Sequence, residues 1–234
     1  MKIHTHLLRV LHKWIGLIIG LQFLLWTLSG AMMALLDMET VAGGERRDPP
    51  RVKAVTTDAW PSVLQRLGAK PITGLTMRPL LDRQLYEVKT PEGVKLFDAA
   101  LGHAVTVDAR LARQVATAAY PGNAQVMRVE PLDKLSLAVR THELPIWRVD
   151  FADEQSSSYY VSATTGALLE RRNDTWRVWD FFWMLHNMDY VNRTSFNHPL
   201  IIMVGFAAVW LAITGFYLLF RTGWRSDFKR LRRD

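Results

Sequence analysis

The apolar run PLIIMVGFAAVWLAITGFYLLF, residues 199–220, contains no charged side chain. A second uncharged run, residues 14–36, lies near the start of the chain. A helix of about 22 residues is roughly 33 Å long, and a bilayer core of about 30 Å needs about 20 apolar residues. Both runs are therefore predicted to be transmembrane helices. The alternative is a pair of buried core helices, which are rarely this long without a charge.

The first run also has an alternative as a signal peptide, because the residues before it are basic. A cleavable signal has an apolar segment of about 7–15 residues, and this run is longer. The sequence SGAMMA at residues 29–34 is only a weak cleavage site. We therefore expect an uncleaved anchor.

The net charge of +7 is concentrated at the two ends of the chain. Residues 1–13 carry +3 and residues 221–234 carry +4, whereas the region between them is neutral. Because basic flanks stay in the cytoplasm, both tails are predicted to be cytoplasmic. The segment between the helices is then periplasmic if the membrane is a bacterial inner membrane. The basic balance is thus explained by the lipid bilayer, and no nucleic-acid partner is expected.

The chain has no cysteine. This excludes disulfides, thiolate metal sites, iron–sulfur clusters and c-type haem attachment. No Walker motif, HExxH, GxGxxG or Ser–His–Asp order stands out either.

The region between the helices shows an internal repeat. After a linker at residues 37–55, amphipathic helices are predicted at residues 58–67 and 108–119, with Asp58 and Asp108 as their N-caps. Alternating strand patterns follow each helix. We therefore predict an α+β membrane protein, in which two transmembrane helices flank two tandem helix–strand–strand repeats, residues 56–106 and 107–173.

Each repeat contains a short turn that ends in glycine. The first is DAALG at residues 98–102, and the second is SATTG at residues 162–166. This duplicated unit resembles the PepSY domain, whose second strand typically ends in a turn of the first kind, and the second turn departs from it at Ser162. Together with LHKWIGL at residues 11–17, it makes the whole chain similar to the PepSY-associated transmembrane family.

The resemblance has consequences for fold and function. It implies a periplasmic ectodomain of two PepSY-like repeats between membrane helices. Some members of the family are b-type haem proteins that reduce ferric iron or ferric siderophores, and others are accessory or peptidase-modulating modules. Longer members have four transmembrane helices, so a chain with two is expected to form a homodimer or join a larger membrane reductase complex.

Histidine is the residue type that could hold such a haem. The ectodomain His103 and His142 are expected to be ordinary surface residues. The other five lie at the membrane boundaries: His4, His6, His12, His186 and His198. His12 is at the cytoplasmic mouth of the first helix, and His186 and His198 are at the outer mouth of the second.

Residues 174–198 are predicted to form an amphipathic interfacial helix and a turn. One face of the helix is aromatic, with Trp176, Trp179, Trp183, His186 and Tyr190 at three- and four-residue spacing. His186 has an alternative role as one more interfacial ring. His198 has an alternative role as a helix N-cap, because Pro199 suits the first helical position.

On the strength of the resemblance, His12, His186 and His198 are predicted to be axial ligands of haem b, with one or two haems per assembly. His12 and His198 lie on opposite membrane faces, roughly 30 Å apart, and cannot share an iron. His186 and His198 could clamp one iron at the outer face. The partner of His12 stays open between His6, His4 and a second chain.

Small residues would let a macrocycle or a second helix approach. Gly16 and Gly20 form a GxxxG motif, which also marks plain helix dimers, and Ala208, Ala212 and Gly215 form a track on the second helix. Arg177 and Arg193 each have two candidate roles, as a contact for an anionic chelate or haem propionate, or as a side chain that reaches lipid phosphate.

The predicted function is that of an inner-membrane b-type haem protein. It would pass electrons from a cytoplasmic or quinol donor to a periplasmic acceptor, ferric iron or a ferric siderophore, as a ferric reductase or as an electron-transfer subunit. The alternative is a non-enzymatic membrane-anchored PepSY module that binds a peptide or a partner protein.

Overall fold

The structure is a computed structural model that describes residues 5–45 and 58–223. The chain divides into two compact units, which are described separately. The helix unit holds residues 5–35 and 179–223, and the sheet unit holds residues 36–45 and 58–178. His4, most of the basic C-terminal tail and part of the predicted linker lie outside the described residues.

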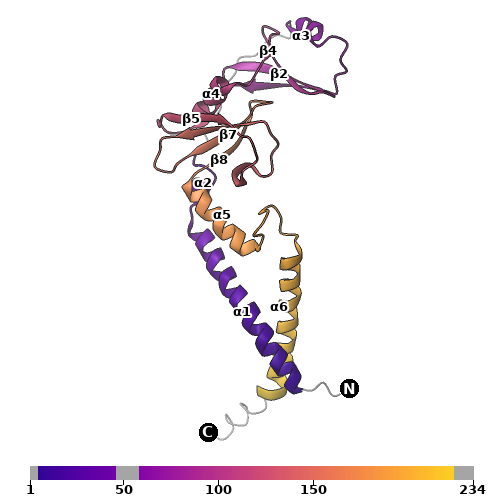
Figure 1. Ribbon diagram of the computed structural model, residues 1–234, viewed down its shortest axis with the longest axis vertical. Coiled ribbons are helices and arrows are strands. Elements are labelled where there is room, and N and C mark those ends of the chain that lie inside the picture. The colour runs from indigo at the N-terminus through magenta and orange to yellow at the C-terminus, as the bar shows by residue number, and fades with distance from the viewer. Residues whose placement is uncertain (1–4, 46–57, 224–234) are drawn as a thin grey trace. The chain divides into compact units, whose positions relative to one another are not determined.

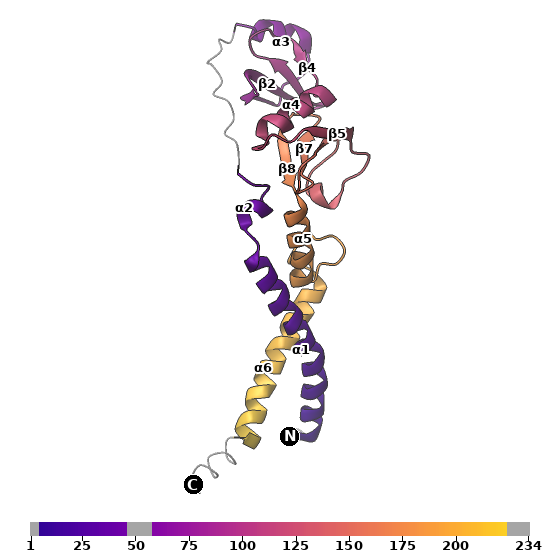
Figure 2. The same cartoon turned by 90° about the vertical axis from the view of Figure 1, so that its left-hand side faces the viewer.

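The helix unit consists of α1 (Thr5–Leu35), the end of α5 (Asp174–Asn187), α6 (Pro199–Leu218) and one π-helical turn, Leu219–Gly223. Both long helices are apolar enough and long enough to cross a membrane. Figures 1 and 2 show α1 and α6 crossing each other. The two predicted apolar helices are therefore present.

A small apolar cluster joins the parts of the helix unit. Ile19 of α1, Met188 after α5 and Val204 of α6 are buried against one another. Partly buried side chains from both long helices surround them, including Trp26 and Leu211. This packing holds the residue after α5 against both long helices.

The aromatic helix is shorter than predicted. α5 ends at Asn187, and Met188 has a φ of 59°. A left-handed residue cannot continue a right-handed helix, so the chain turns there. The prediction that Tyr190 shares the helical face was therefore wrong.

The sheet unit contains two antiparallel four-stranded sheets, each in sequential strand order. The first sheet follows α3 (Trp60–Leu67), and the second follows α4 (Ala109–Ala119). Its strands are β1 (Gly74–Leu80), β2 (Arg83–Thr90), β3 (Gly93–Asp98) and β4 (Ala104–Val105), then β5 (Val126–Pro131), β6 (Ile146–Phe151), β7 (Ser158–Ser162) and β8 (Leu168–Arg172). A short helix α2 (Met38–Val41) and a 3₁₀ turn (Leu137–Val139) complete the unit.

Each helix covers one sheet. Val63 and Leu67 of α3 pack on Tyr86, Val88 and Phe97 of the first sheet. The larger core joins α4, the second sheet and the other face of the first sheet. The buried members of this core are Leu80, Leu85, Leu96, Val107, Ala112, Val115, Ala116, Val149, Phe151, Tyr159 and Val161.

The α+β class is confirmed, but each repeat is larger than the sequence predicted. Four strands follow each helix, where two were expected. The missed strands are the first of each sheet, β1 and β5; each is an edge strand that holds a proline, and β1 is mostly exposed. Asp108 caps α4 through the amide of Leu111 as expected, whereas the N-cap of α3 is Ala59 and not Asp58.

The two glycine turns have the same hydrogen-bond pattern. Gly102 donates its amide to the carbonyl of Asp98, and Gly166 does the same to Ser162, each at 2.8 Å. The side-chain oxygens of Asp98 and Ser162 accept the intervening amides. Both glycines have a φ near 70°, at 68° and 70°. The Ser162 departure in the sequence therefore preserves the turn, because a hydroxyl replaces the carboxylate as acceptor.

Candidate functional site

His12 is held by a hydroxyl group on the opposite helix. Its Nδ1 lies 2.7 Å from Oγ1 of Thr214. The Thr214 hydroxyl donates its one proton to backbone carbonyls of its own helix, with Trp210 O at 2.8 Å. This geometry suits an Nδ1–H of His12 donated to that hydroxyl, an arrangement that leaves the lone pair on Nε2.

The His12 ring lies directly against Gly215. A Cβ added to Gly215 would stand 3.3 Å from Cε1 of His12 and 3.8 Å from its Nε2. Beside the ring is an apolar groove of about 440 Å³ between α1 and α6. Its lining residues are His12, Phe23, Ala208, Leu211, Ala212, Gly215, Phe216 and Leu219. The small-residue track seen in the sequence thus forms one wall of a groove that His12 enters.

His186 is held in the same way at the other end of α1. Its Nδ1 lies 3.2 Å from Oγ of Ser29 and 3.2 Å from the carbonyl oxygen of Trp26. A carbonyl can only accept, and the Ser29 hydroxyl donates to Leu25 O at 2.6 Å. Nδ1 must therefore be the protonated nitrogen, and Nε2 again bears the lone pair.

A hydroxyl residue followed by glycine recurs at both histidines. Ser29 precedes Gly30, and a Cβ on Gly30 would stand 3.3 Å from Cε1 of His186. Thr214 precedes Gly215 beside His12 in the same relation. In each case the hydroxyl orients the ring and the missing side chain makes room for it. This is the outer-sphere arrangement that metal-bound histidines use, with one ring N–H donated and the other nitrogen free.

His198 is in the opposite tautomer. It occupies the N-cap position of α6, with Pro199 as the first helical residue. Its side chain does not cap the helix, and its Nε2 lies 2.7 Å from the carbonyl oxygen of Asn187. Because a carbonyl only accepts, Nε2 is protonated and its lone pair is unavailable. The structure therefore gives His186 and His198 different backbone partners, on α1 and at the end of α5.

The loop between α5 and α6 is folded around a buried carboxylate. Asp189 accepts backbone N–H groups of Asn192 at 3.0 Å, Thr194 at 2.8 Å and Ser195 at 3.4 Å. Burial raises the pKa of Asp189, but the backbone donors outweigh burial and lower that pKa to about 2. Arg193 in the same loop pairs with the buried Asp180 of α5 at 2.8 Å. The guanidinium of Arg193 therefore forms an ion pair within the protein.

The remaining histidines lie away from these positions. His6 is exposed on the first turn of α1, and His103 is exposed in the sheet unit. His142 bonds Glu170 through Nε2 at 2.9 Å. Within residues 5–45 and 58–223, no group of three or more His, Asp or Glu side chains could hold a metal ion.

Three buried N–H donors of the helix unit have no hydrogen-bond acceptor among the described residues. They are Nε2 of Gln22, Nε1 of Trp26 and Nδ2 of Asn187. Gln22 and Trp26 lie one turn apart on α1, and Asn187 follows His186 directly. Polar groups of this kind are costly in an apolar medium.

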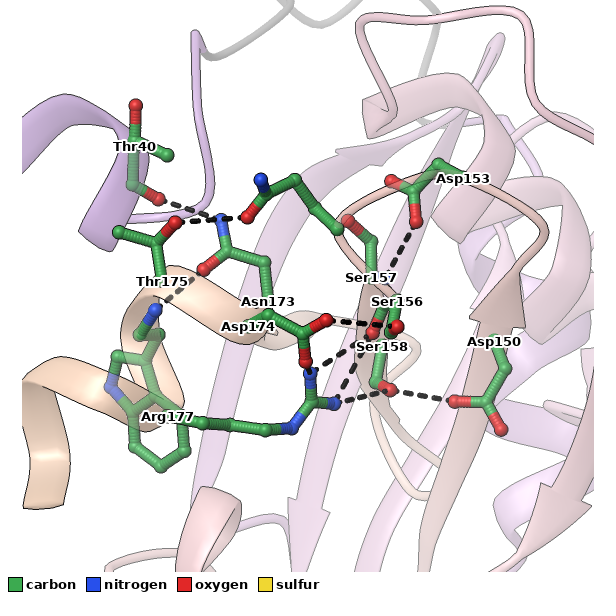
Figure 3. A network of polar contacts seen from close by, with 12 residues as sticks. Thr40, Asp150, Asp153, Ser156, Ser157, Ser158, Asn173, Asp174, Thr175 and Arg177 are labelled. Atoms are coloured by element: carbon green, nitrogen blue, oxygen red, sulfur yellow. Dashed lines mark hydrogen bonds and ion pairs between the residues drawn. The ribbon is translucent and has the colours of Figure 1, made fainter.

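The sheet unit has a separate polar pocket of about 280 Å³. Figure 3 shows the network of polar contacts around Ser158, which lines this pocket. At its centre the buried Ser158 hydroxyl donates to Asp150 at 2.7 Å and accepts from Arg148 and Arg177. Each arginine is also paired with a carboxylate, Asp150 or Asp174. Nearby, burial together with a hydrogen bond to Asp153 raises the pKa of Tyr120 to about 12. Asn173 ties this region to α2 through Thr40.

Sequence position was enough to single out His12, His186 and His198, but it could not identify their partners. Ser29 and Thr214 are ordinary helix residues in the sequence, and they meet their histidines only across 157 and 202 residues of chain. The one local signal is that each precedes a glycine inside an apolar helix.

Comparison with protein families gives one match. The model described as PepSY-associated TM region covers residues 9–234. Comparisons with curated proteins and with solved structures find no match.

Proposed function

Because the chain belongs to the family of the PepSY-associated TM region, we propose that it binds haem and passes electrons across its membrane to a ferric acceptor. It is a membrane protein with two helices of spanning length. The observation that supports the haem proposal is the shared state of His12 and His186. In both rings Nδ1 faces a protein oxygen, and an Nδ1–H donated to that oxygen leaves the Nε2 lone pair for iron.

The residues around His12 fit a flat apolar macrocycle. The groove beside it is lined by aliphatic and aromatic carbon and by the small residues Ala208, Ala212 and Gly215. A haem supplies one-electron chemistry, and the protein around it sets the reduction potential through the axial ligands and burial. In this chain, Thr214 and Ser29 would fix the orientation of the two ligand rings and raise their basicity.

The two histidines mark two levels of the bilayer. His12 is on α1, and His186 contacts α1 at Ser29 and Gly30. Residues 12 and 30 are separated by roughly 27 Å along a helix at 1.5 Å per residue. One haem position near each face, and not one shared position, is therefore proposed.

We assign His198 a positioning role in place of ligation. Its Nε2 proton is donated to Asn187, the residue after His186. That bond ties the start of α6 to the end of α5 and so holds His186 at its depth.

The charge pattern orients the chain in the membrane, and the proposed periplasmic acceptor gives the direction of electron flow. With basic tails in the cytoplasm, the sheet unit is periplasmic and its two α+β halves are the PepSY-like repeats. The donor would be a cytoplasmic protein or a membrane quinol, and the acceptor would be ferric iron or a ferric siderophore. The protein would then act as a ferric reductase or as the electron-transfer subunit of one.

The test is a set of single alanine variants of the detergent-solubilised protein, with haem measured per chain. His12→Ala and His186→Ala should each remove one haem position. His198→Ala should keep both positions and lower their stability, and the exposed His103→Ala is the matched control with wild-type haem content. Wild-type haem content in both His12→Ala and His186→Ala would refute the ligand assignment.

One observation favours a second function, that of an anchored binding module. The polar pocket around Ser158 offers two arginines and two carboxylates to a small polar group, such as a peptide end. This function needs no cofactor. It would be the better account of the protein if cells supplied with haem yield a colourless preparation.

A further inference from the structure

The polar pocket of the sheet unit contains an arginine with unused hydrogen-bond donors. Arg148 lines the pocket, and its Nε donates to Oδ1 of Asp150 at 2.8 Å. Its Nη2 lies 3.4 Å from Oγ of Ser158. A guanidinium has five N–H donors in a planar fork. Among the described residues Nη1 of Arg148 has no acceptor, so Nη1 and the second Nη2 proton form a pair of donors that the protein does not use.

A second arginine reaches the same hydroxyl from another element. Nη2 of Arg177, on α5, lies 3.3 Å from Oγ of Ser158, as Figure 3 shows. The Arg177 guanidinium is held there by the carboxylate of Asp174 and the carbonyl oxygen of Ser156. Two cationic groups therefore meet at one buried hydroxyl, and they make this part of the pocket attractive to a negative charge.

The carboxylates that line the pocket already have donors. Oδ1 of Asp150 accepts hydrogen bonds from Ser158 at 2.7 Å and from Arg148. Asp153 accepts the Tyr120 hydroxyl at 2.9 Å and a backbone amide at 2.7 Å. Each carboxylate thus has two donors within the protein, whereas Arg148 has donors left over. A ligand that supplies acceptors is therefore the better complement to this pocket.

We infer that the pocket binds a carboxylate group, which pairs with the unused Nη1 and Nη2 donors of Arg148. Arg177 would supply the second positive charge. Arginine and carboxylate form two parallel hydrogen bonds, which gives this pairing its strength and its geometry. The inference names the ligand class of the second candidate function, on which it rests, and it does not depend on haem.

The charge and size of the pocket narrow the ligand further. Asp150 and Asp153 also line it, and they repel a doubly charged phosphate more than a singly charged carboxylate. A volume of about 280 Å³ suits a small acid or the last residue of a peptide. Met127 is 70% exposed and lies where the pairing of β5 with β6 shifts. Its side chain lines the pocket and offers an apolar contact to the group that carries the carboxylate.

The test titrates the full-length, detergent-solubilised protein with four probes and measures affinity by isothermal titration calorimetry. The probes are an acetylated Ala–Leu dipeptide with a free carboxylate, the same dipeptide as its amide, propionate and inorganic phosphate. We expect the dipeptide acid to bind about 10–100-fold more tightly than the amide, the usual gain from hydrogen bonds to a charged group. Tighter binding of the dipeptide acid than of propionate assigns a peptide end, and the reverse assigns a small free acid. Either order supports a carboxylate site.

Two pairs of variants locate the site. Arg148→Lys keeps the charge but loses the fork, so the affinity for the dipeptide acid should fall about 10-fold, whereas Arg113→Lys, at an exposed position of α4 outside the pocket, should change nothing. Met127→Glu adds a negative charge at an exposed position and should also weaken binding, whereas the uncharged Met127→Gln should bind nearly as the wild type does. The Met127 pair keeps the test valid if Arg148→Lys fails to fold.

Three results would overturn the inference. Equal affinity for the acid and the amide would leave a binding pocket but remove the carboxylate from it. Tighter binding of phosphate than of either carboxylate probe would assign a different anion. Absence of binding by every probe would overturn the inference together with the second candidate function, and the haem content of the same preparation would still decide the haem proposal separately.

Discussion

The Ser29 and Thr214 hydroxyls decide which nitrogen of each histidine is free. His186 has two acceptors for its Nδ1 proton, Ser29 Oγ and Trp26 O, whereas Thr214 Oγ1 is the side-chain acceptor for His12. Loss of the hydroxyl should therefore weaken haem binding more at His12 than at His186.

Thr214→Val removes that acceptor with little change of shape. We expect haem affinity at the His12 position to fall about 10–100-fold, the usual effect of losing an outer-sphere partner. Thr214→Ser keeps the hydroxyl and should bind haem as the wild type does. Ser29→Ala should have a smaller effect at the His186 position, because Trp26 O remains. Haem titration of the apoprotein measures all three, and equal losses in the valine and serine variants of Thr214 would contradict the argument.

Gly215 gives a second test at the scale of one residue. Gly215→Ala places a Cβ 3.3 Å from Cε1 of His12, tighter than most carbon contacts, so the ring must shift. We expect a changed low-spin spectrum or weaker haem binding at this position. Gly205→Ala is the matched control, because an added Cβ meets nothing within 4 Å there. The same spectral change in both variants would show that helix stiffening, and not the ring contact, is responsible.

Among the elements, the loop from Met188 to His198 does the most to position the candidate site. Asp189 gathers three backbone amides of the loop, and Arg193 pairs with Asp180 of α5. The loop therefore sets the angle between α5, which carries His186, and α6. Its stability should depend on the ionised form of Asp189.

The stability that Asp189 gives to the loop is expected to fall at low pH. The folded-state pKa of Asp189 is lowered to about 2 from an ordinary value of 3.8. Its contribution to stability is therefore full above pH 4 and is lost as the pH falls toward 2. We expect the protection factor of the Thr194 amide, its exchange relative to an unprotected amide at the same pH, to fall as the pH falls across this window. Asp189→Asn should accelerate that exchange at neutral pH and abolish the dependence, whereas the exposed Asp133→Asn should change neither.

The helices and strands show which features of the fold could be predicted from sequence patterns. The two apolar helices and the α+β class were predictable, because uncharged runs and amphipathic repeats are local properties of the chain. The edge strand β1 was missed, since its exposed side chains show no burial alternation and it contains Pro79. The end of α5 at Asn187 was missed because Met188 adopts a left-handed conformation that its residue type does not announce.

For the candidate site, the sequence could identify the three histidines but not which ring nitrogen of each forms a hydrogen bond. His12, His186 and His198 all stand at membrane boundaries, and nothing in the sequence separates them. The three rings differ in the nitrogen that forms the hydrogen bond. Nδ1 of His12 and His186 contacts Thr214, or Ser29 and Trp26, whereas Nε2 of His198 contacts the Asn187 carbonyl. Such contacts join residues far apart in the chain, so only the folded helix unit distinguishes candidate ligands from a positioning residue.

At the scale of the whole molecule, the chain consists of two units. One unit holds the two apolar helices with His12 and His186, and the other holds two four-stranded antiparallel sheets. The proposed haem positions lie in the first unit, and the polar pocket of the second candidate function lies in the second.

The most direct test is the absorption spectrum of the purified wild-type protein, oxidised and dithionite-reduced, with haem quantified per chain. We predict a reduced b-type spectrum from bound haem. A colourless protein from cells supplied with haem would contradict it and leave the anchored binding module as the function to pursue.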